Sequence, residues 1–296
     1  YSLMARRIKA AVFHVHGTID QNVKMDHFTS MWRALEAANV PRKALIGPWR
    51  HSEPVVDHWH LQALRWFEHW LQRNDTGMMR EPAVTTISQR RVERTASAYA
   101  GKQATTLYAS SGTLSARPRG GAASYRDVPG LPRQLLMGAE GARLLYDSAP
   151  MPTRTRIVGV PVVDLYATID TNDTNFVAHL YDVAPGGKAT YISRGYLDAR
   201  HRQGLARGTD VASGKPLNYR IELLAQDYEL AEGHVLRLLL ASSDSCAWLV
   251  EDLAGLSCTS SGVVSDASAA GVTMHEGPGL TRLTLPVGRL AGRRLH

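Results

Sequence analysis

The sequence predicts an α/β unit over residues 1–81, followed by an all-β jelly-roll sandwich over residues 82–296. In the first unit, short apolar runs that end at a glycine alternate with segments of helical periodicity, which is typical of a parallel sheet. After residue 81, short apolar runs alternate with turn residues, and no convincing long helical pattern occurs. Many strands at such spacing favour a β-sandwich or a jelly roll.

Four elements are expected in the α/β unit. Residues 8–17 and residues 42–49 are apolar runs that each reach a glycine, so both predict buried strands. Residues 25–38 and residues 55–71 carry apolar side chains at helical spacing, which predicts two amphipathic helices. In the order strand, helix, strand, helix, the two strands are expected to lie parallel in one sheet.

The all-β part is predicted from short runs of β-forming residues that turn signals separate, such as Ser111-Gly112. The runs cover residues 83–90, 104–110, 161–169, 175–183, 189–197, 217–224, 234–242 and 280–288. Each is long enough for one strand of a sandwich.

Composition excludes some classes of partner. The chain has 44% hydrophobic residues and a formal net charge of +7. Its basic residues are scattered, so we expect a solvated basic surface and no nucleic-acid partner. No apolar run approaches the roughly 18 residues that cross a bilayer, so we expect no membrane partner. The chain opens on Tyr1 and soon enters a strand, so we expect the natural N-terminus to lie elsewhere.

The cysteines and paired histidines give no clear site. Cys246 and Cys258 stand twelve positions apart. A disulfide between them would suit a secreted protein, and two unrelated thiols are an equal alternative. His14 and His16 share one face of a strand, but no third ligand stands at a metal-binding spacing, so we expect no metal.

One acid and one histidine stand where catalytic residues are expected. Asp20 follows the first predicted strand and His51 follows the second. Because parallel strands end at the same edge of a sheet, we expect both side chains to lie there together. A carboxylate that orients an imidazole is the acid–base part of a nucleophilic triad.

The residues around Asp20 and His51 resemble the sequence motifs of one enzyme family. "HGTIDQNV" at residues 16–23 and "GPWRH" at residues 47–51 resemble the X-Pro dipeptidyl-peptidase family of serine hydrolases and its cocaine-esterase-like relatives. "FEHWL" resembles the family's helix after the catalytic histidine, and residues 144–197 and 219–244 resemble strands of its C-terminal jelly roll.

The resemblance implies a catalytic acid, Asp20, and a catalytic base, His51. It implies that residues 1–81 are the C-terminal part of an α/β-hydrolase sheet and that residues 82–296 form a galactose-binding-like jelly roll. The implied substrate is a peptide with proline second from its N-terminus, and no cofactor is implied. The esterase branch would instead imply an ester or amide substrate. Trp49, beside the histidine, is a candidate to line the substrate pocket.

The chain departs from the family at the nucleophile. These enzymes carry their serine in a G-x-S-x-G elbow, and no such motif occurs in the 296 residues. We therefore expect the serine to come from an N-terminal catalytic segment or from a companion chain. A non-catalytic binding or assembly module is the third interpretation, because jelly rolls often bind sugars or partner chains.

Overall fold

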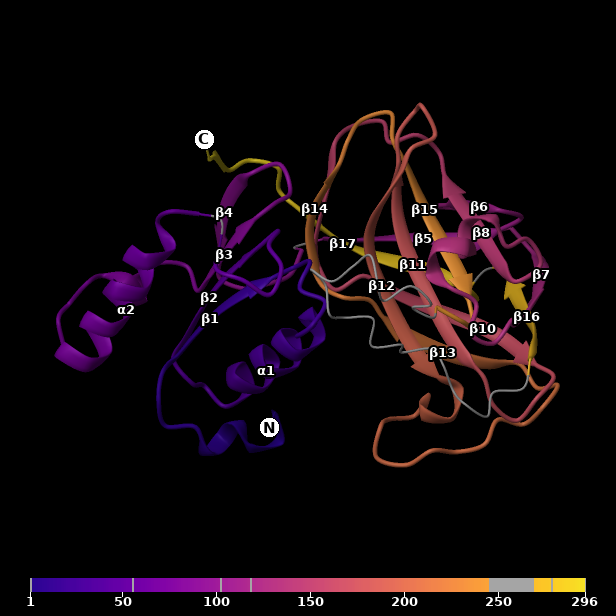
Figure 1. The fold of residues 1–296 in the computed structure, drawn as a ribbon, viewed down its shortest axis with the longest axis horizontal. Helices are drawn as coiled ribbons and strands as arrows, with labels where there is room; N and C mark the ends of the chain where they lie inside the picture. Colours follow the sequence, from indigo (N-terminus) through magenta and orange to yellow (C-terminus); the bar gives the residue numbers. More distant parts are fainter. Residues whose placement is uncertain are drawn as a thin grey trace.

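A computed structural model describes residues 2–54, 56–101, 103–117, 119–244, 269–277 and 279–295. Most of this part is β-structure, arranged in one small sheet with two helices and one larger sheet beside it (Figure 1). None of the described helices is long and apolar enough to cross a membrane. Cys246 and Cys258 lie outside the described residues.

The small sheet has five strands in the order β1-β2-β3-β4-β18. These strands are β1 (Val12–Gly17), β2 (Arg42–Gly47), β3 (Val84–Ile87), β4 (Val92–Ala96) and β18 (Arg293–Arg294). Strands β1, β2 and β3 pair in parallel, which confirms the parallel pairing expected for the first two strands. Strand β4 is antiparallel to β3, and β18 is antiparallel to β4. The sheet therefore continues beyond residue 81, with its last strand supplied by the end of the chain.

Helix α1 covers the face of this sheet that meets the larger β-structure. The helix spans Met25–Ala37, and the chain leaves it through Asn39, whose φ of 53° is a left-handed conformation that asparagine tolerates. Phe28 and Trp32 are buried in a core that also contains Leu224 from the larger β-structure. This shared core fixes α1 between the two parts of the molecule.

Helix α2 covers the opposite face and leaves much of its apolar surface open. The helix spans Trp59–Gln72, so it begins later than residue 55. Trp66 is buried and packs on Phe13 of β1, with ring centroids 5.7 Å apart. The exposed large apolar side chains of the helix are Leu61, Leu64, Phe67, Trp70 and Leu71.

Within the described ranges the larger sheet has thirteen strands, and every pairing among them except β6 with β8 is antiparallel. Its strands are β5 (Gln103–Ser110), β6 (Thr113–Ser115), β7 (Gly121–Arg126), β8 (Arg143–Ser148), β9 (Thr155–Gly159), β10 (Val162–Ile169), β11 (Asn175–Val183), β12 (Ala189–Asp198), β13 (Leu217–Glu222), β14 (Gln226–Leu230), β15 (Val235–Ala241), β16 (Gly271–Glu276) and β17 (Arg282–Gly288). The main path runs β12-β11-β15-β8-β6-β5-β17-β10-β16-β7, and the strands enclose a main apolar core, with a smaller cluster around Leu136 and Leu239. Short 3-10 turns lie at Ser2–Arg7, Met78–Arg80, Arg133–Gly138 and Ala199–His201.

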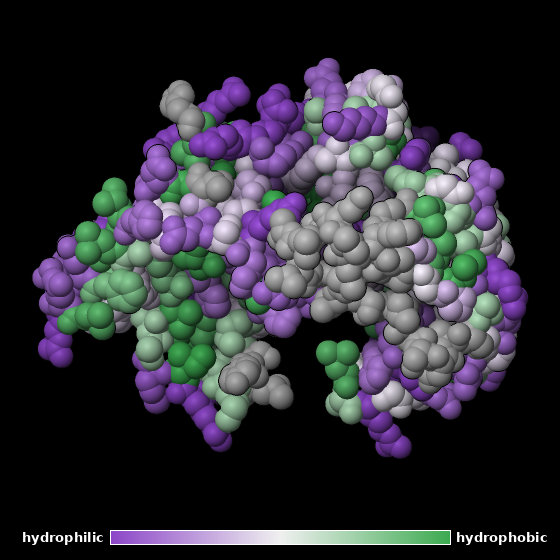
Figure 2. Space-filling view, viewed as in Figure 1, coloured by the Kyte–Doolittle hydropathy of each residue, from purple (hydrophilic) through white to green (hydrophobic). Residues whose placement is uncertain are grey.

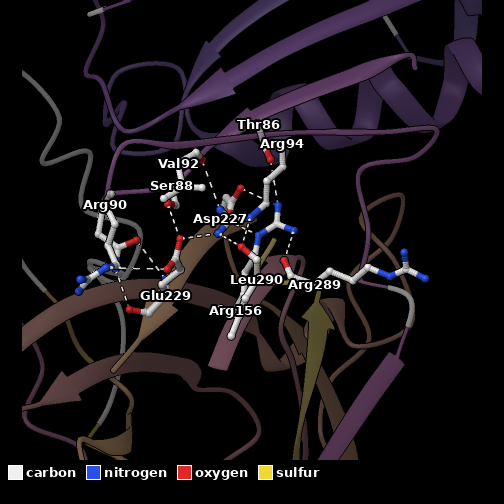
Figure 3. Close-up of polar contacts among 11 residues, drawn as sticks. Thr86, Ser88, Arg90, Val92, Arg94, Arg156, Asp227, Glu229, Arg289 and Leu290 are labelled. Atoms are coloured by element: carbon white, nitrogen blue, oxygen red, sulfur yellow. Dashed lines mark hydrogen bonds and ion pairs between the residues drawn. The ribbon is translucent and has the colours of Figure 1, made fainter. Parts of the chain in front are cut away.

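A buried polar network joins the two parts where β3 and β4 meet β9 and β14 (Figure 3). Arg156 donates two hydrogen bonds of 2.7 Å to Asp227 and a third of 2.9 Å to the hydroxyl of Thr86. Arg94 donates to Glu229 at 2.8 Å. Because each of these buried charges is paired, their desolvation is offset and the network sets how the two parts meet.

Candidate active site

The ends of β1 and β2 approach closely because each strand ends in glycine. A Cβ on Gly17 would lie 2.0 Å from the carbonyl oxygen of Trp49, and a Cβ on Gly47 would lie 2.0 Å from its indole ring. The backbone N–H of Thr18 donates to the carbonyl of Gly47 at 2.7 Å. Any larger side chain at either glycine would push the two strand ends apart. The two glycines therefore place the following loops side by side.

Both carboxylate oxygens of Asp20 are engaged in this loop. Oδ1 accepts from the backbone N–H groups of Asn22 at 2.8 Å and Val23 at 3.0 Å. Oδ2 lies 2.8 Å from Nδ1 of His51. His16 donates from Nε2 to the carbonyl of Val23 at 2.8 Å and closes the loop from the side of β1. Asp20 is 5% exposed, so its orientation is fixed by these contacts.

The contact with Asp20 sets the chemistry that His51 can perform. Because a carboxylate oxygen only accepts hydrogen bonds, Nδ1 of the imidazole carries the proton, which leaves Nε2 as the basic nitrogen. The side chain of His51 is 59% exposed, whereas that of Asp20 is 6% exposed. Nε2 makes no hydrogen bond to any other side chain that the structure describes. The arrangement presents one oriented base at the surface with its acid buried behind it.

A cleft of about 430 Å³ lies over this pair. Its lining includes Asp20, His51, Glu53 and Trp59. Trp49 also contributes to the lining, but the residue is only 3% exposed and belongs to the apolar core beneath the cleft. Its main contacts are therefore with the core, and a role in substrate binding stays a prediction.

Two further residues hold the Asp20 loop, and both come from the larger β-structure. Arg194 of β12 donates to the side-chain oxygen of Gln21 at 2.8 Å. Gln226 of β14 donates to the carbonyl of Thr18 at 3.2 Å. Sequence reasoning did not find them, because 173 and 208 positions separate these pairs along the chain. The other end of the first contact, Gln21, does lie within a recognisable motif, because it follows Asp20 directly in "DQNV".

His14 and His16 lie apart from any recognisable metal centre. Within the described ranges, no group of three or more histidine, cysteine, aspartate or glutamate residues is placed to hold a metal ion. The ring of His14 packs edge-on against Phe28, with centroids 5.4 Å apart. The two histidines therefore serve packing and loop closure in this structure.

Comparison with known families assigns both parts of the chain. Residues 1–53 match the X-Pro dipeptidyl-peptidase (S15 family) model. Residues 71–252 match the X-Pro dipeptidyl-peptidase C-terminal non-catalytic domain. The first range contains Asp20 and His51, and the second contains most of the larger β-structure.

Individual relatives cover most of this chain and less than half of their own length. A Bacillus anthracis protein provisionally named an Xaa-Pro dipeptidyl-peptidase is 28% identical over 256 residues, which are 81% of this chain and 42% of that protein. A Mycobacterium bovis protein provisionally named a serine esterase is 25% identical over 292 residues, 80% of this chain and 45% of that one.

A solved structure shows the same fold. An aminopeptidase from a marine-sediment Thaumarchaeota archaeon matches 97% of this chain and 57% of its own, with a TM-score of 0.79 and 16% identity. The chain thus corresponds to about half of this structure and about two fifths of the curated relatives. Because the C-terminal domain model matches more than half of the residues and the S15 model matches the segment with the Asp20–His51 pair, the chain belongs to the X-Pro dipeptidyl-peptidase family.

Proposed function

We propose that this chain is the C-terminal portion of a serine hydrolase whose nucleophilic serine is supplied from outside residues 1–296. The hydrogen bond of 2.8 Å between Asp20 and His51, at the ends of two adjacent parallel strands, is the observation that carries the proposal. In this proposal the small sheet, with helices α1 and α2, belongs to an α/β-hydrolase sheet and the larger β-structure is a jelly roll. The boundary expected at residue 81 shifts, because β3, β4 and β18 join the small sheet.

The chemistry follows from the state of the imidazole. As the serine oxygen attacks the acyl carbon, Nε2 of His51 takes the hydroxyl proton, and Asp20 stabilises the imidazolium that forms. His51 then gives that proton to the leaving amine or alcohol, and the acyl-enzyme remains. In the second half, His51 takes a proton from water, the hydroxide attacks the ester carbon, and the proton returns to the serine.

Two surfaces support a partner segment that carries the serine. Strand β1 is at the edge of the small sheet and pairs only with β2 among the described strands. Figure 2 shows hydrophobic residues gathered at the end of the molecule that α2 forms. Leu61, Phe67 and Leu71 of this helix are 61%, 55% and 75% exposed. An open edge strand next to an exposed apolar helix favours further strands and helices of the same sheet as the occupant.

The proposed substrate is a peptide, from which the assembled enzyme releases an Xaa-Pro dipeptide at the N-terminus. The Bacillus anthracis relative's name supports this choice. Ester or amide hydrolysis is the second candidate, and the name of the Mycobacterium bovis relative supports it. Both reactions pass through the same acyl-enzyme, so the Asp20–His51 pair serves either one.

A fluorophosphonate label tests the proposal directly. The native preparation is treated with the label, and the intact mass of every chain is measured. We expect the label on a serine outside residues 1–296, in an N-terminal segment or in a companion chain, and its rate of labelling should fall in a His51→Gln variant. Xaa-Pro p-nitroanilides and p-nitrophenyl esters then separate the two substrate classes. A label that peptide mapping places within residues 1–296, or no label on any chain, would refute the proposal, and the second result would favour a non-catalytic binding module.

A further inference from the structure

The loop that carries Asp20 is held from the larger β-structure by two side chains. Arg194 donates to the side-chain oxygen of Gln21, the residue next to the acid, at 2.8 Å. Gln226 donates to the carbonyl of Thr18 at 3.2 Å. Arg194 and Gln226 are 1% and 4% exposed, so both donors are held inside the structure. The loop is therefore fixed by a part of the chain that contributes nothing to the Asp20–His51 contact itself.

Arg194 is itself immobilised by a buried polar cluster. Its guanidinium lies 3.6 Å from the carboxylate of Asp244 and 5.3 Å from the ring centre of Tyr196. Asp244 accepts a hydrogen bond from the Tyr196 hydroxyl at 2.9 Å and another from His179 at 3.1 Å. Burial alone would raise the pKa of the Asp244 carboxyl, but the contacts with His179, Arg194 and Tyr196 hold it below its ordinary value. An anchored carboxylate thus holds the guanidinium in one place.

The backbone of the loop transmits this restraint to the acid. Gln21 lies between Asp20 and Asn22 in the chain, and the backbone N–H of Asn22 donates to the Asp20 carboxylate. A shift of Gln21 would move that N–H and the N–H of Val23, and the carboxylate would turn away from His51. The side chain that fixes Gln21 therefore also fixes the direction in which Asp20 points.

We propose that Arg194 is a positioning residue for the catalytic acid, acting through Gln21, with Gln226 as a second hold on the same loop. The proposal rests on the proposed function only for the catalytic role of Asp20. In this proposal the larger β-structure has a structural role in the site, although it contributes no group to the Asp20–His51 pair. That part of the chain sets the geometry of the pair by holding its loop.

The test uses Gln21 rather than Arg194, because removing Arg194 would leave Asp244 buried without its cation. Gln21→Met removes the acceptor at similar length, and Gln21→Glu keeps an acceptor oxygen for Arg194. Arg33→Met is a control for a general loosening of the junction, because Arg33 also bridges the two parts, at 3.0 Å from Glu222, but in an exposed place away from the Asp20 loop. The readouts on this chain alone are amide hydrogen exchange of Asn22 and Val23 and the ¹⁵N signals of the His51 imidazole.

We expect Gln21→Met to speed amide hydrogen exchange at Asn22 and Val23 by about tenfold, because the loop loses one hydrogen bond from a charged donor. The Nδ1-protonated form of His51 should decline in parallel, while Gln21→Glu and Arg33→Met resemble the wild type. In the assembled hydrolase, Gln21→Met should lower kcat by a similar factor and leave KM unchanged. Unchanged exchange and imidazole signals in Gln21→Met would overturn the positioning role, as would equal effects in Arg33→Met. If both signals respond but the assembled wild type never turns over, the positioning role stands and the proposed function fails.

Discussion

Replacing Asp227 by asparagine tests whether burial strengthens the Arg156–Asp227 pair, which lies in the larger sheet at its junction with the small one. Asp227 accepts two hydrogen bonds of 2.7 Å from Arg156, and the two side chains are 0% and 8% exposed. Asparagine keeps the shape but leaves the Arg156 guanidinium buried without its anion. Breaking a buried pair in this way costs about 3–5 kcal/mol, so we expect Asp227→Asn to lower the free energy of unfolding by about that amount.

A second pair in the same molecule supplies the matched control. Arg237 donates to Asp147 at 2.7 and 2.6 Å, with side chains 25% and 37% exposed. Its two short arginine–aspartate hydrogen bonds match those of the buried pair, but the side chains are in contact with water. Because water screens it, Asp147→Asn should cost about 0.2–1 kcal/mol.

Urea unfolding, followed by circular dichroism at pH 7, measures both losses. We expect the free energies of unfolding of the two variants to differ by about 3 kcal/mol, and their slopes against urea concentration to be similar. Equal losses from Asp227→Asn and Asp147→Asn would refute this expectation, because geometry rather than burial would then set the strength of these pairs.

Three further outcomes are expected. In the assembled hydrolase, Asp20→Asn should lower kcat by about 10⁴-fold, measured with a chromogenic substrate, since the imidazole loses its orienting anion. Leu64→Glu combined with Phe67→Glu should weaken binding to the serine-bearing segment in a pull-down, while the thermal midpoint of this chain changes little; unchanged binding would exclude the α2 face as the docking surface. Burial, aided by the charge of His16, lowers the pKa of His14 below its ordinary value of 6.5. The unfolded chain therefore takes up this proton first as pH falls, so stability should drop below pH 6.5, and His14→Phe should show a smaller drop in urea midpoints between pH 7.5 and pH 5.

The α/β part was largely predictable because its pattern is local. Residues 12–17 and 42–47 form the two expected parallel strands, and the Asp20–His51 contact follows from where they end. The strand-like run at residues 83–90 does form a strand, β3, but it pairs with β2 in the small sheet. Propensity marks a strand and carries no information on which neighbour it pairs with.

Other features depend on contacts that no local pattern contains. Leu64 and Phe67 fit the expected amphipathic helix, yet both are exposed, because periodicity reveals an apolar face and not what covers it. Strand β14 starts with Gln226 and carries Asp227 and Glu229, polar residues that look solvent-facing in the sequence. Glu229 and Gln226 pair across the junction with Arg94 of the small sheet and with Thr18 after its first strand. Asp227 pairs with Arg156 of the neighbouring strand β9, so each of the three buried polar side chains has a distant partner.

The return of the chain to the small sheet has a consequence for biosynthesis. Strand β18 pairs with β4, where Arg293 meets Glu93 across 200 positions of sequence. Leu295 packs into the same core cluster as Trp49, beneath the His51 loop. On the ribosome, β4 must wait until the 200 positions between Glu93 and Arg293 have been made before it gains this neighbour, and such distant pairings form slowly. The His51 loop therefore gains the support of Leu295 only after residues 293–295 are made, so a chain cut before them would carry Asp20 and His51 without that contact in the core below.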